Sequence, residues 1–409
     1  DLGYFQPAST GDTLQRLGPE EYVVTRTDGT RYTYKGYLAP WRENRPPDAG
    51  RLIRIQDRYG NTTTYSRDGQ GRVVTVQDTA GRTITLEYVA GGVGRVVGPA
   101  GTTTFEYDGD SRLVRVVKPN GQETRYSYDT SHRLVEVTDG EGGRTRFQYD
   151  SEGRVTAVVD PGGWVRLRFA YDPAARRTTM TDALGRAWVY TFDDKGRLLE
   201  ERNPLGEETA YQYDDKGRLT VVSGPRGTFT TEYDERGRPV RQTDPAGGTV
   251  LTEYEPVWGF VSRVVDQAGS ETRFEYDGRG SLAARIDPLG HRTTYGYDDR
   301  GRLVSVTDPL GNTILLGYDA AGNVTRRTDG AGETTLYEYD ASGRLARVTE
   351  PTGAQTTTVY DAAGRLLRVV DPLGKEVRLE YDRAGRLRSL TNPHGESFSY
   401  TYDAAGRVR

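Results

Sequence analysis

The stretch "YDDRGRLVSVTDPLGNT", residues 297–313, decides the fold because the chain keeps repeating it. It returns at 318 as "YDAAGNVTRRTDGAGET", at 339 as "YDASGRLARVTEPTGAQ", at 360 as "YDAAGRLLRVVDPLGKE" and at 381 as "YDRAGRLRSLTNPHGES". From Tyr107 to Tyr402, successive aromatic-Asp pairs are 21 residues apart or differ from that spacing by one. This regularity predicts a repeat protein that grows by adding units instead of building around one centre.

The signature of each unit is Tyr-Asp, in several units followed by Gly and Arg at the third and fourth positions after the Asp. We expect these residues to have a structural role in the repeat. They are Tyr107, Asp108, Tyr128, Asp129, Tyr149, Asp150, Tyr213, Asp214, Tyr276, Asp277, Tyr297, Asp298, Gly301, Arg302, Tyr318, Asp319, Tyr339, Asp340, Gly343, Arg344, Tyr360, Asp361, Gly364, Arg365, Tyr381, Asp382, Gly385, Arg386, Tyr402 and Asp403.

Each unit carries two tight turns and two short strands. In D-x-x-G-R the Asp bonds its own backbone and the Gly takes positive φ, and D-P-x-G forms a second turn of the same kind. Thr293, Tyr295 and Tyr297 share one face of their strand at a period of two. Leu303 and Val306 are three apart, so they face opposite sides unless a bulge intervenes.

The repeat sets the fold class, which we predict to be all-β: an array of antiparallel β-hairpins forming a long coiled sheet. Sixteen or so units with strands about 4.8 Å apart give a width of roughly 150 Å. Twist curls such a sheet into a spiralling hollow shell, barrel or tube, with a diameter near 50 Å for a single turn, roughly estimated from the same spacing.

The chain divides into two regions. Degenerate copies at Tyr65 and Tyr88 place the start of the array near residue 50, so residues 50–409 form the array, which ends mid-unit. Residues 1–49 are expected to be a strand-rich capping region, with Trp41 and the Pro46-Pro47 pair at its boundary.

Composition excludes several classes of function. The 55 Lys+Arg against 59 Asp+Glu give a net charge of -4 with the signs interspersed, which does not favour nucleic acid as a partner. Without Cys there is neither a thiolate nucleophile nor a disulfide framework. No apolar run approaches the ~20 residues of a membrane span.

Candidate sites are few, and we expect neither an enzyme nor a cofactor or metal. Each Asp has a turn to cap and an Arg four residues on, as in Asp298 and Arg302. The histidines, His132, His291 and His394, occupy turn positions, and "DGEGG" at 139–143 is a weak cation candidate.

The aromatic residues leave two alternatives open. The Tyr rings can form ladders between strands, which the fixed spacing favours, or a face that binds glycans. Trp164, Trp188 and Trp258 break the pattern and are better candidates for a specific contact.

The motif Y-D-x-x-G-R-L-x-x-V-x-D-P-x-G at 21-residue spacing resembles the YD repeat of bacterial Rhs proteins, of the toxin-enclosing component of Tc toxins and of animal teneurins. The resemblance covers about residues 50–409. It implies a spiralling hollow β-shell that often encloses a C-terminal toxin domain of the same polypeptide before delivery.

We therefore expect a non-catalytic shell that helps deliver a toxin domain absent from this chain, secreted or on the surface of a bacterium. The alternative is an extracellular adhesin or fibre-forming protein, which binds cell-surface glycans or further copies of itself.

Overall fold

The computed structural model describes the chain except for residues 1–11, 19–20, 27, 37–48 and 404–406. The predicted boundary at Trp41 and Pro46-Pro47 lies outside the described residues. The described residues form one antiparallel sheet of 37 strands, which confirms the all-β prediction. Among the described residues, no helix is long and apolar enough to cross a membrane.

The strands are short and evenly spaced along the chain. The first nineteen are β1 Thr13–Gly18, β2 Glu21–Thr25, β3 Arg31–Lys35, β4 Leu52–Gln56, β5 Thr62–Arg67, β6 Val73–Asp78, β7 Thr83–Val89, β8 Gly92–Gly98, β9 Gly101–Tyr107, β10 Leu113–Val117, β11 Glu123–Tyr128, β12 Leu134–Thr138, β13 Arg144–Tyr149, β14 Val155–Val159, β15 Val165–Asp172, β16 Arg177–Asp182, β17 Ala187–Phe192, β18 Leu198–Arg202 and β19 Glu208–Tyr213. The remainder are β20 Leu219–Gly224, β21 Gly227–Tyr233, β22 Pro239–Thr243, β23 Thr249–Tyr254, β24 Val261–Val265, β25 Glu271–Tyr276, β26 Leu282–Ile286, β27 Arg292–Tyr297, β28 Leu303–Thr307, β29 Thr313–Tyr318, β30 Val324–Thr328, β31 Thr334–Tyr339, β32 Leu345–Thr349, β33 Gln355–Tyr360, β34 Leu366–Val370, β35 Glu376–Tyr381, β36 Leu387–Thr391 and β37 Ser397–Ser399.

Each strand pairs with the next along the chain, so the sheet is a continuous meander. The hairpin of β27 and β28 shows the register of one unit: Tyr297 lies opposite Leu303 and Tyr295 opposite Val306, with a register shift between them. That shift is a β-bulge, one of the two alternatives that the spacing of Leu303 and Val306 left open. It puts both side chains on the face that carries Tyr295 and Tyr297, because opposed residues of an antiparallel pair share a face.

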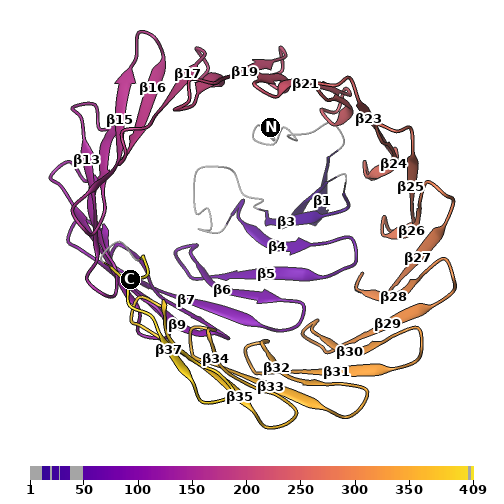
Figure 1. Cartoon of the computed structure of the whole chain (residues 1–409). Helices are drawn as coiled ribbons and strands as arrows, with labels where there is room; N and C mark the ends of the chain where they lie inside the picture. The colour runs from indigo at the N-terminus through magenta and orange to yellow at the C-terminus, as the bar shows by residue number, and fades with distance from the viewer. Residues whose placement is uncertain (1–11, 19–20, 27, 37–48, 404–406) are drawn as a thin grey trace.

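The sheet coils until it overlaps itself (Figure 1). The Nδ2 of Asn61 donates to the carbonyl oxygen of Arg300 at 2.9 Å across 239 residues of sequence. One turn of the coil therefore takes about 23 strands, from the β4–β5 hairpin to the β27–β28 hairpin. At about 4.8 Å per strand, the circumference of this turn is roughly 110 Å, which is shorter than the roughly 150 Å expected if all units formed a single turn.

The coil has little conventional core. Its accessible surface is 25122 Å², whereas a compact protein of this mass exposes about 16,000 Å². The fully buried residues are few, and include Val23 at 1% and Ala284 at 0% exposure. A single-layered sheet explains this surface, and the fold must be held by contacts between neighbouring hairpins and between the turns of the coil.

Candidate functional site: the repeat clamps and the seam of the coil

The Asp of each signature organises the turn that follows it. The Oδ1 of Asp298 accepts the backbone N–H of Arg300 and of Arg302, both at 2.9 Å. Its Oδ2 accepts the Nε–H of Arg302 at 2.7 Å, which is the predicted ion pair. Gly301 has a φ of 75°, a left-handed conformation that suits glycine, and His132 takes the equivalent position of its own unit with a φ of 60°.

These hydrogen bonds determine the charge state of the turn. Burial alone raises the pKa of the Asp298 carboxyl, but the backbone N–H and the guanidinium of Arg302 outweigh it and lower that pKa overall. At Asp108, the backbone N–H of Arg112 is the largest influence and again the pKa is lowered. The carboxylates of Asp298 and Asp108 are therefore ionised at neutral pH, and each is paired with the Arg of its own turn.

The Arg of one unit also holds the Tyr of the next. The Nη1 of Arg302 donates to the carbonyl oxygen of Asp319 at 3.0 Å, and its guanidinium lies 4.7 Å from the ring centre of Tyr318. The Tyr318 hydroxyl donates back to the carbonyl oxygen of Leu303 at 2.6 Å. We call this set of contacts the clamp, because it joins consecutive units through a cation–π contact and hydrogen bonds.

The clamp recurs along the array, with the Arg sixteen residues, give or take one, before the Tyr. Guanidinium and ring pair in Arg72–Tyr88, Arg112–Tyr128, Arg133–Tyr149, Arg154–Tyr171, Arg197–Tyr213, Arg218–Tyr233, Arg238–Tyr254, Arg302–Tyr318, Arg344–Tyr360, Arg365–Tyr381 and Arg386–Tyr402. The expected ladder of Tyr rings is thus an alternating ladder of guanidinium and ring. The signature residues are spread along the coil and are not gathered into one cluster.

Alternate turns of a meander lie on opposite edges, so the coil has two rims. The Tyr-Asp rim carries the turns that follow the signature, such as residues 298–302. The Asp-Pro rim carries the turns of the D-P-x-G type, such as residues 308–312. The seam of the coil forms where the Asp-Pro rim of the first turn meets the Tyr-Asp rim of the second.

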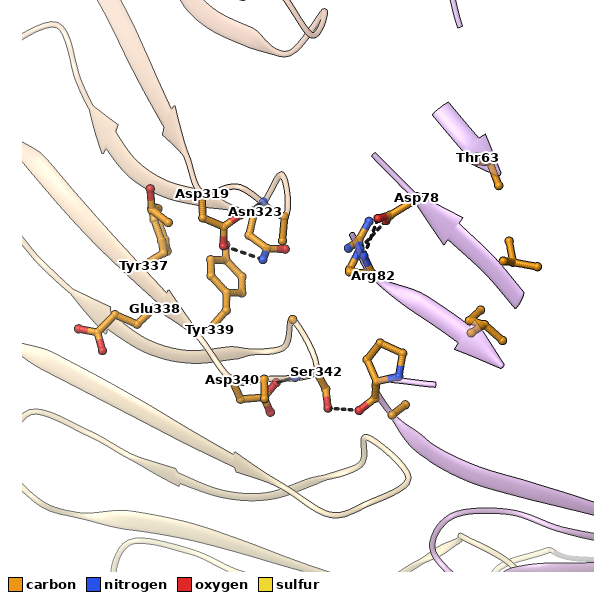
Figure 2. A pocket seen from close by; sticks show the side chains of 18 residues that line it. Thr63, Asp78, Arg82, Asp319, Asn323, Tyr337, Glu338, Tyr339, Asp340 and Ser342 are labelled. Atoms are coloured by element: carbon orange, nitrogen blue, oxygen red, sulfur yellow. Dashed lines mark hydrogen bonds and ion pairs between the residues drawn. The ribbon is translucent and has the colours of Figure 1, made fainter. Parts of the chain in front are cut away.

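Hydrogen bonds cross this seam at several points. The hydroxyl of Ser342 donates to the carbonyl oxygen of Pro99 at 2.9 Å (Figure 2). The Nε2 of Gln122 donates to the carbonyl oxygen of Ala384 at 2.6 Å, and the N–H of Ala384 donates to the carboxylate of Glu141 at 3.1 Å. The weak cation candidate at 139–143 therefore has a different use: Glu141 holds the seam, and Asp139 accepts the N–H of Gly143 at 2.8 Å within its own turn.

The most extensive seam contact is made by Arg58 and Tyr59, in the turn between β4 and β5, which we call the latch. The Tyr59 hydroxyl lies 3.0 Å from that of Ser281, and Arg58 donates to the Tyr59 hydroxyl at 2.9 Å. The Arg58 guanidinium lies 5.8 Å from the ring centre of Trp258 and 5.1 Å from that of Phe260.

The residues that receive the latch depart from the repeat. Ser281 stands where other units have Arg, and it is only 3% exposed. Gly301 lies so close that a Cβ there would be 2.4 Å from the Tyr59 ring. Of the three irregular Trp residues, Trp258 contacts Arg58 within the chain, Trp188 meets Arg186 of its own turn, and Trp164 is 71% exposed. No group of three or more potential metal ligands occurs among the described residues.

An open pocket of about 850 Å³ lies in the seam beyond the latch (Figure 2). Asp78 pairs with Arg82 on one side of it, and the Asp319 carboxylate accepts the Nδ2 of Asn323 on the other. The pocket lies where Asn323 replaces the Arg of the clamp, next to Tyr339. Its charged groups already have partners, Glu338 in Arg347 of the adjacent strand β32 and the others within their own turns, so we assign no catalysis to them.

The comparisons with known proteins agree with this architecture. Residues 91–255 and 312–409 match the Teneurin YD-shell family, and residues 47–83 and 278–313 match the RHS Repeat family. The chain therefore belongs to the Rhs/YD-repeat family of β-shell proteins. It is 32% identical over 122 residues to the toxin protein Tse5 of Pseudomonas aeruginosa, which covers 29% of this chain and 9% of that protein.

Solved structures show the same fold. A crystal structure of TcdB2-TccC3 superposes with a TM-score of 0.66 at 15% identity, covering 94% of this chain and 26% of that one. The Tc holotoxin pore of Photorhabdus luminescens superposes with a TM-score of 0.62 at 18% identity, covering 97% and 26%. The chain spans about a quarter of the length of these proteins.

Proposed function

We propose that this chain is a wall segment of an Rhs-type shell, which encloses a toxin domain of the same polypeptide before its delivery. The observation that carries the proposal is a single-layered sheet that coils past one full turn and is fastened to itself by the latch. A toxin protein among its relatives and the Tc toxin structures of the same fold support it. The location that fits is outside the bacterial cell or on its surface.

The residue roles in this proposal are structural. The Tyr, Asp, Gly and Arg of the signature form the turns and clamps of the array in residues 50–409, and residues 1–49 cap its first edge. The proposal assigns them no catalysis, since their carboxylates are held by Arg and backbone N–H groups in turn after turn. The adhesin and fibre alternative gains no support from the seam, which joins turns of one chain.

Electron microscopy and intact mass of the protein isolated from its source test this function together. We expect discrete hollow particles and a mass well above the 45.4 kDa of this chain, with a toxin domain among the additional sequence. Long regular filaments, or a preparation of 45.4 kDa chains without further sequence, would overturn the proposal. The same imaging on a Tyr59→Ala variant provides a control in which the wall is unlatched.

A further inference from the structure

Tyr339 lacks the guanidinium that the clamp normally places on the ring. Asn323 stands sixteen residues before it, at the position that Arg302 holds before Tyr318. The Tyr339 hydroxyl still donates to the carbonyl oxygen of Val324 at 2.8 Å, so the ring keeps its usual place in the unit. Among the residues that the structure describes, no guanidinium or second ring lies on it.

The other signature tyrosines without this Arg differ from Tyr339, because other atoms take the place of the guanidinium. The residues sixteen positions earlier are Phe260 before Tyr276, with ring centres 5.3 Å apart, Gly91 before Tyr107, with the glycine backbone against the ring, and Ser281 before Tyr297, with Tyr59 of the latch bonded to the serine. Phe192 keeps Arg176 at the same spacing. Before Tyr339, the place of the guanidinium instead opens into the seam pocket of about 850 Å³, which both Tyr339 and Asn323 line.

The polar groups that hold the Arg of a clamp are still in place around Asn323. In the regular unit, the guanidinium of Arg302 donates to the carboxylate of Asp298 and to the carbonyl oxygen of Asp319. The first equivalent group here is the Asp319 carboxylate, whose side-chain partner is the neutral amide of Asn323 at 2.9 Å. The second is the carbonyl oxygen of Asp340, which accepts one N–H of its own turn at 2.9 Å and has a second lone pair.

The charge of Asp319 is not balanced within its turn. Burial raises the pKa of its carboxyl, but hydrogen bonds from the side-chain amide and the backbone N–H of Asn323 outweigh burial and lower that pKa overall. The carboxylate is therefore ionised at neutral pH beside a neutral partner. On the other side of the pocket, Arg82 is already paired with Asp78 at 2.6 Å (Figure 2). The negative charge of Asp319 thus remains for a cationic ligand.

We propose that this pocket binds an alkylguanidinium group, the chemical equivalent of the missing Arg side chain. The planar group lies on the Tyr339 ring and donates to the Asp319 carboxylate and to the carbonyl oxygen of Asp340, as the guanidinium does in a clamp. Val76 and Ile84, on strands β6 and β7 of the first turn, line the same pocket and offer apolar surface to the alkyl chain. An ammonium lacks the planar fork and makes fewer of these contacts at once.

Saturation-transfer NMR on the full chain tests the site, with butylguanidinium as the probe and butylammonium as its matched control. We expect saturable binding of butylguanidinium and roughly tenfold weaker binding of butylammonium. Equal binding of the two probes, or no binding of butylguanidinium, would overturn the proposal.

The same measurement separates two sources of the group, a free small molecule and an Arg side chain of another polypeptide. The probe for the second source is a capped peptide with one central arginine among glycines. If butylguanidinium and the peptide both bind, the pocket admits an Arg side chain; if butylguanidinium alone binds, the pocket is restricted to small molecules. Both results support a guanidinium site.

Variants locate the binding. Asn323→Arg supplies the group from within the chain and should abolish saturable binding of butylguanidinium, whereas Ala246→Arg adds the same charge at an exposed turn and should leave it unchanged. Tyr339→Phe keeps the ring face and should retain binding, whereas Tyr339→Leu should weaken it roughly tenfold. Urea midpoints show whether each variant is folded. Binding that survives in folded Asn323→Arg would overturn the proposal.

Discussion

The hydroxyl of Tyr59 lies 3.0 Å from the hydroxyl of Ser281, although 222 residues separate them in the chain. This contact fastens the second turn of the coil to the first at a point where both sides depart from the repeat. The strands within each turn are held by continuous ladders of backbone hydrogen bonds, whereas the seam is held by separate side-chain contacts. Separation of the turns should therefore need less free energy than separation of neighbouring strands.

Removal of the latch should loosen the seam without unfolding the sheet. We expect Tyr59→Phe to cost about 1 kcal/mol through loss of the hydroxyl that hydrogen-bonds both Ser281 and Arg58, and Tyr59→Ala roughly 2 kcal/mol through loss of the whole half-buried side chain. Hydrogen exchange should accelerate in residues 57–61 and 298–302 while β12 and β13 stay protected. Phe229→Ala, which removes a ring that is 46% exposed, is the control. Equal acceleration throughout the chain would contradict a local latch.

Introducing Arg at two of the positions where the repeat lacks it should have opposite effects. Ser281→Arg puts a long cation into the buried space beside Tyr59, so we expect it to destabilise the protein by about 2 kcal/mol or more. Asn323→Arg meets an open pocket and an unoccupied ring face at Tyr339, so it should stabilise by about 0.5–1 kcal/mol through a new clamp. Urea midpoints of the two variants measure this difference. If both substitutions shifted the urea midpoint in the same direction, contact with the latch would not explain why Ser replaces Arg at position 281.

The clamp should require Arg rather than a positive charge alone. Arg302→Lys keeps the charge but loses the planar group that reaches Asp298, Asp319 and the Tyr318 ring at once. We expect a loss of about 1 kcal/mol and faster local exchange in β28 and β29. The exposed Arg236→Lys serves as the reference substitution. An Arg302→Lys variant as stable as the parent would show that the clamp contributes little.

Acid should destabilise the array in a definite pH range. In the folded protein the pKa of turn carboxyls such as Asp298 lies below the usual value. Hydrogen bonds from Arg263, which have the larger effect, and from Arg273 lower the pKa of the Glu271 carboxyl to about 2. As pH falls below about 4, the unfolded chain takes up protons before the folded one, so stability is present above this pH and is lost below it.

Urea midpoints between pH 7 and pH 2 measure this loss. We expect a plateau above about pH 5 and a steep decline below pH 4. Glu271→Gln should reduce the slope between about pH 4 and pH 2, because that group then no longer titrates. A urea midpoint that stays constant from pH 7 to pH 3 would contradict the claim that the turn carboxylates are paired in the folded protein.

Most of the local structure of one repeat unit can be predicted from the sequence, but the contacts that fasten one turn of the coil to the next cannot. The two turns, the Asp298–Arg302 pair and the turn position of His132 follow from spacing and residue type, whereas the structure decides that Leu303 is followed by a bulge. The partner of Tyr59 could not be predicted, because a contact across 222 residues leaves no periodic pattern in a single sequence. The interruptions at Ser281 and Trp258 mark the latch, and only the coil shows that they face the same turn. The role of Arg in the Tyr ladder was also missed, since it links residues sixteen apart in different units.

The central claim is that the sheet coils past itself, and a distance between spin labels tests it most directly. The chain has no Cys, so Ala80→Cys with Ala320→Cys labels two turns that line one seam pocket without interference. We predict a short distance for this pair, and a longer one for Ala246→Cys with Ala320→Cys. An uncoiled sheet would place the first pair about 23 strands apart, or roughly 110 Å, and that distance would contradict the coil.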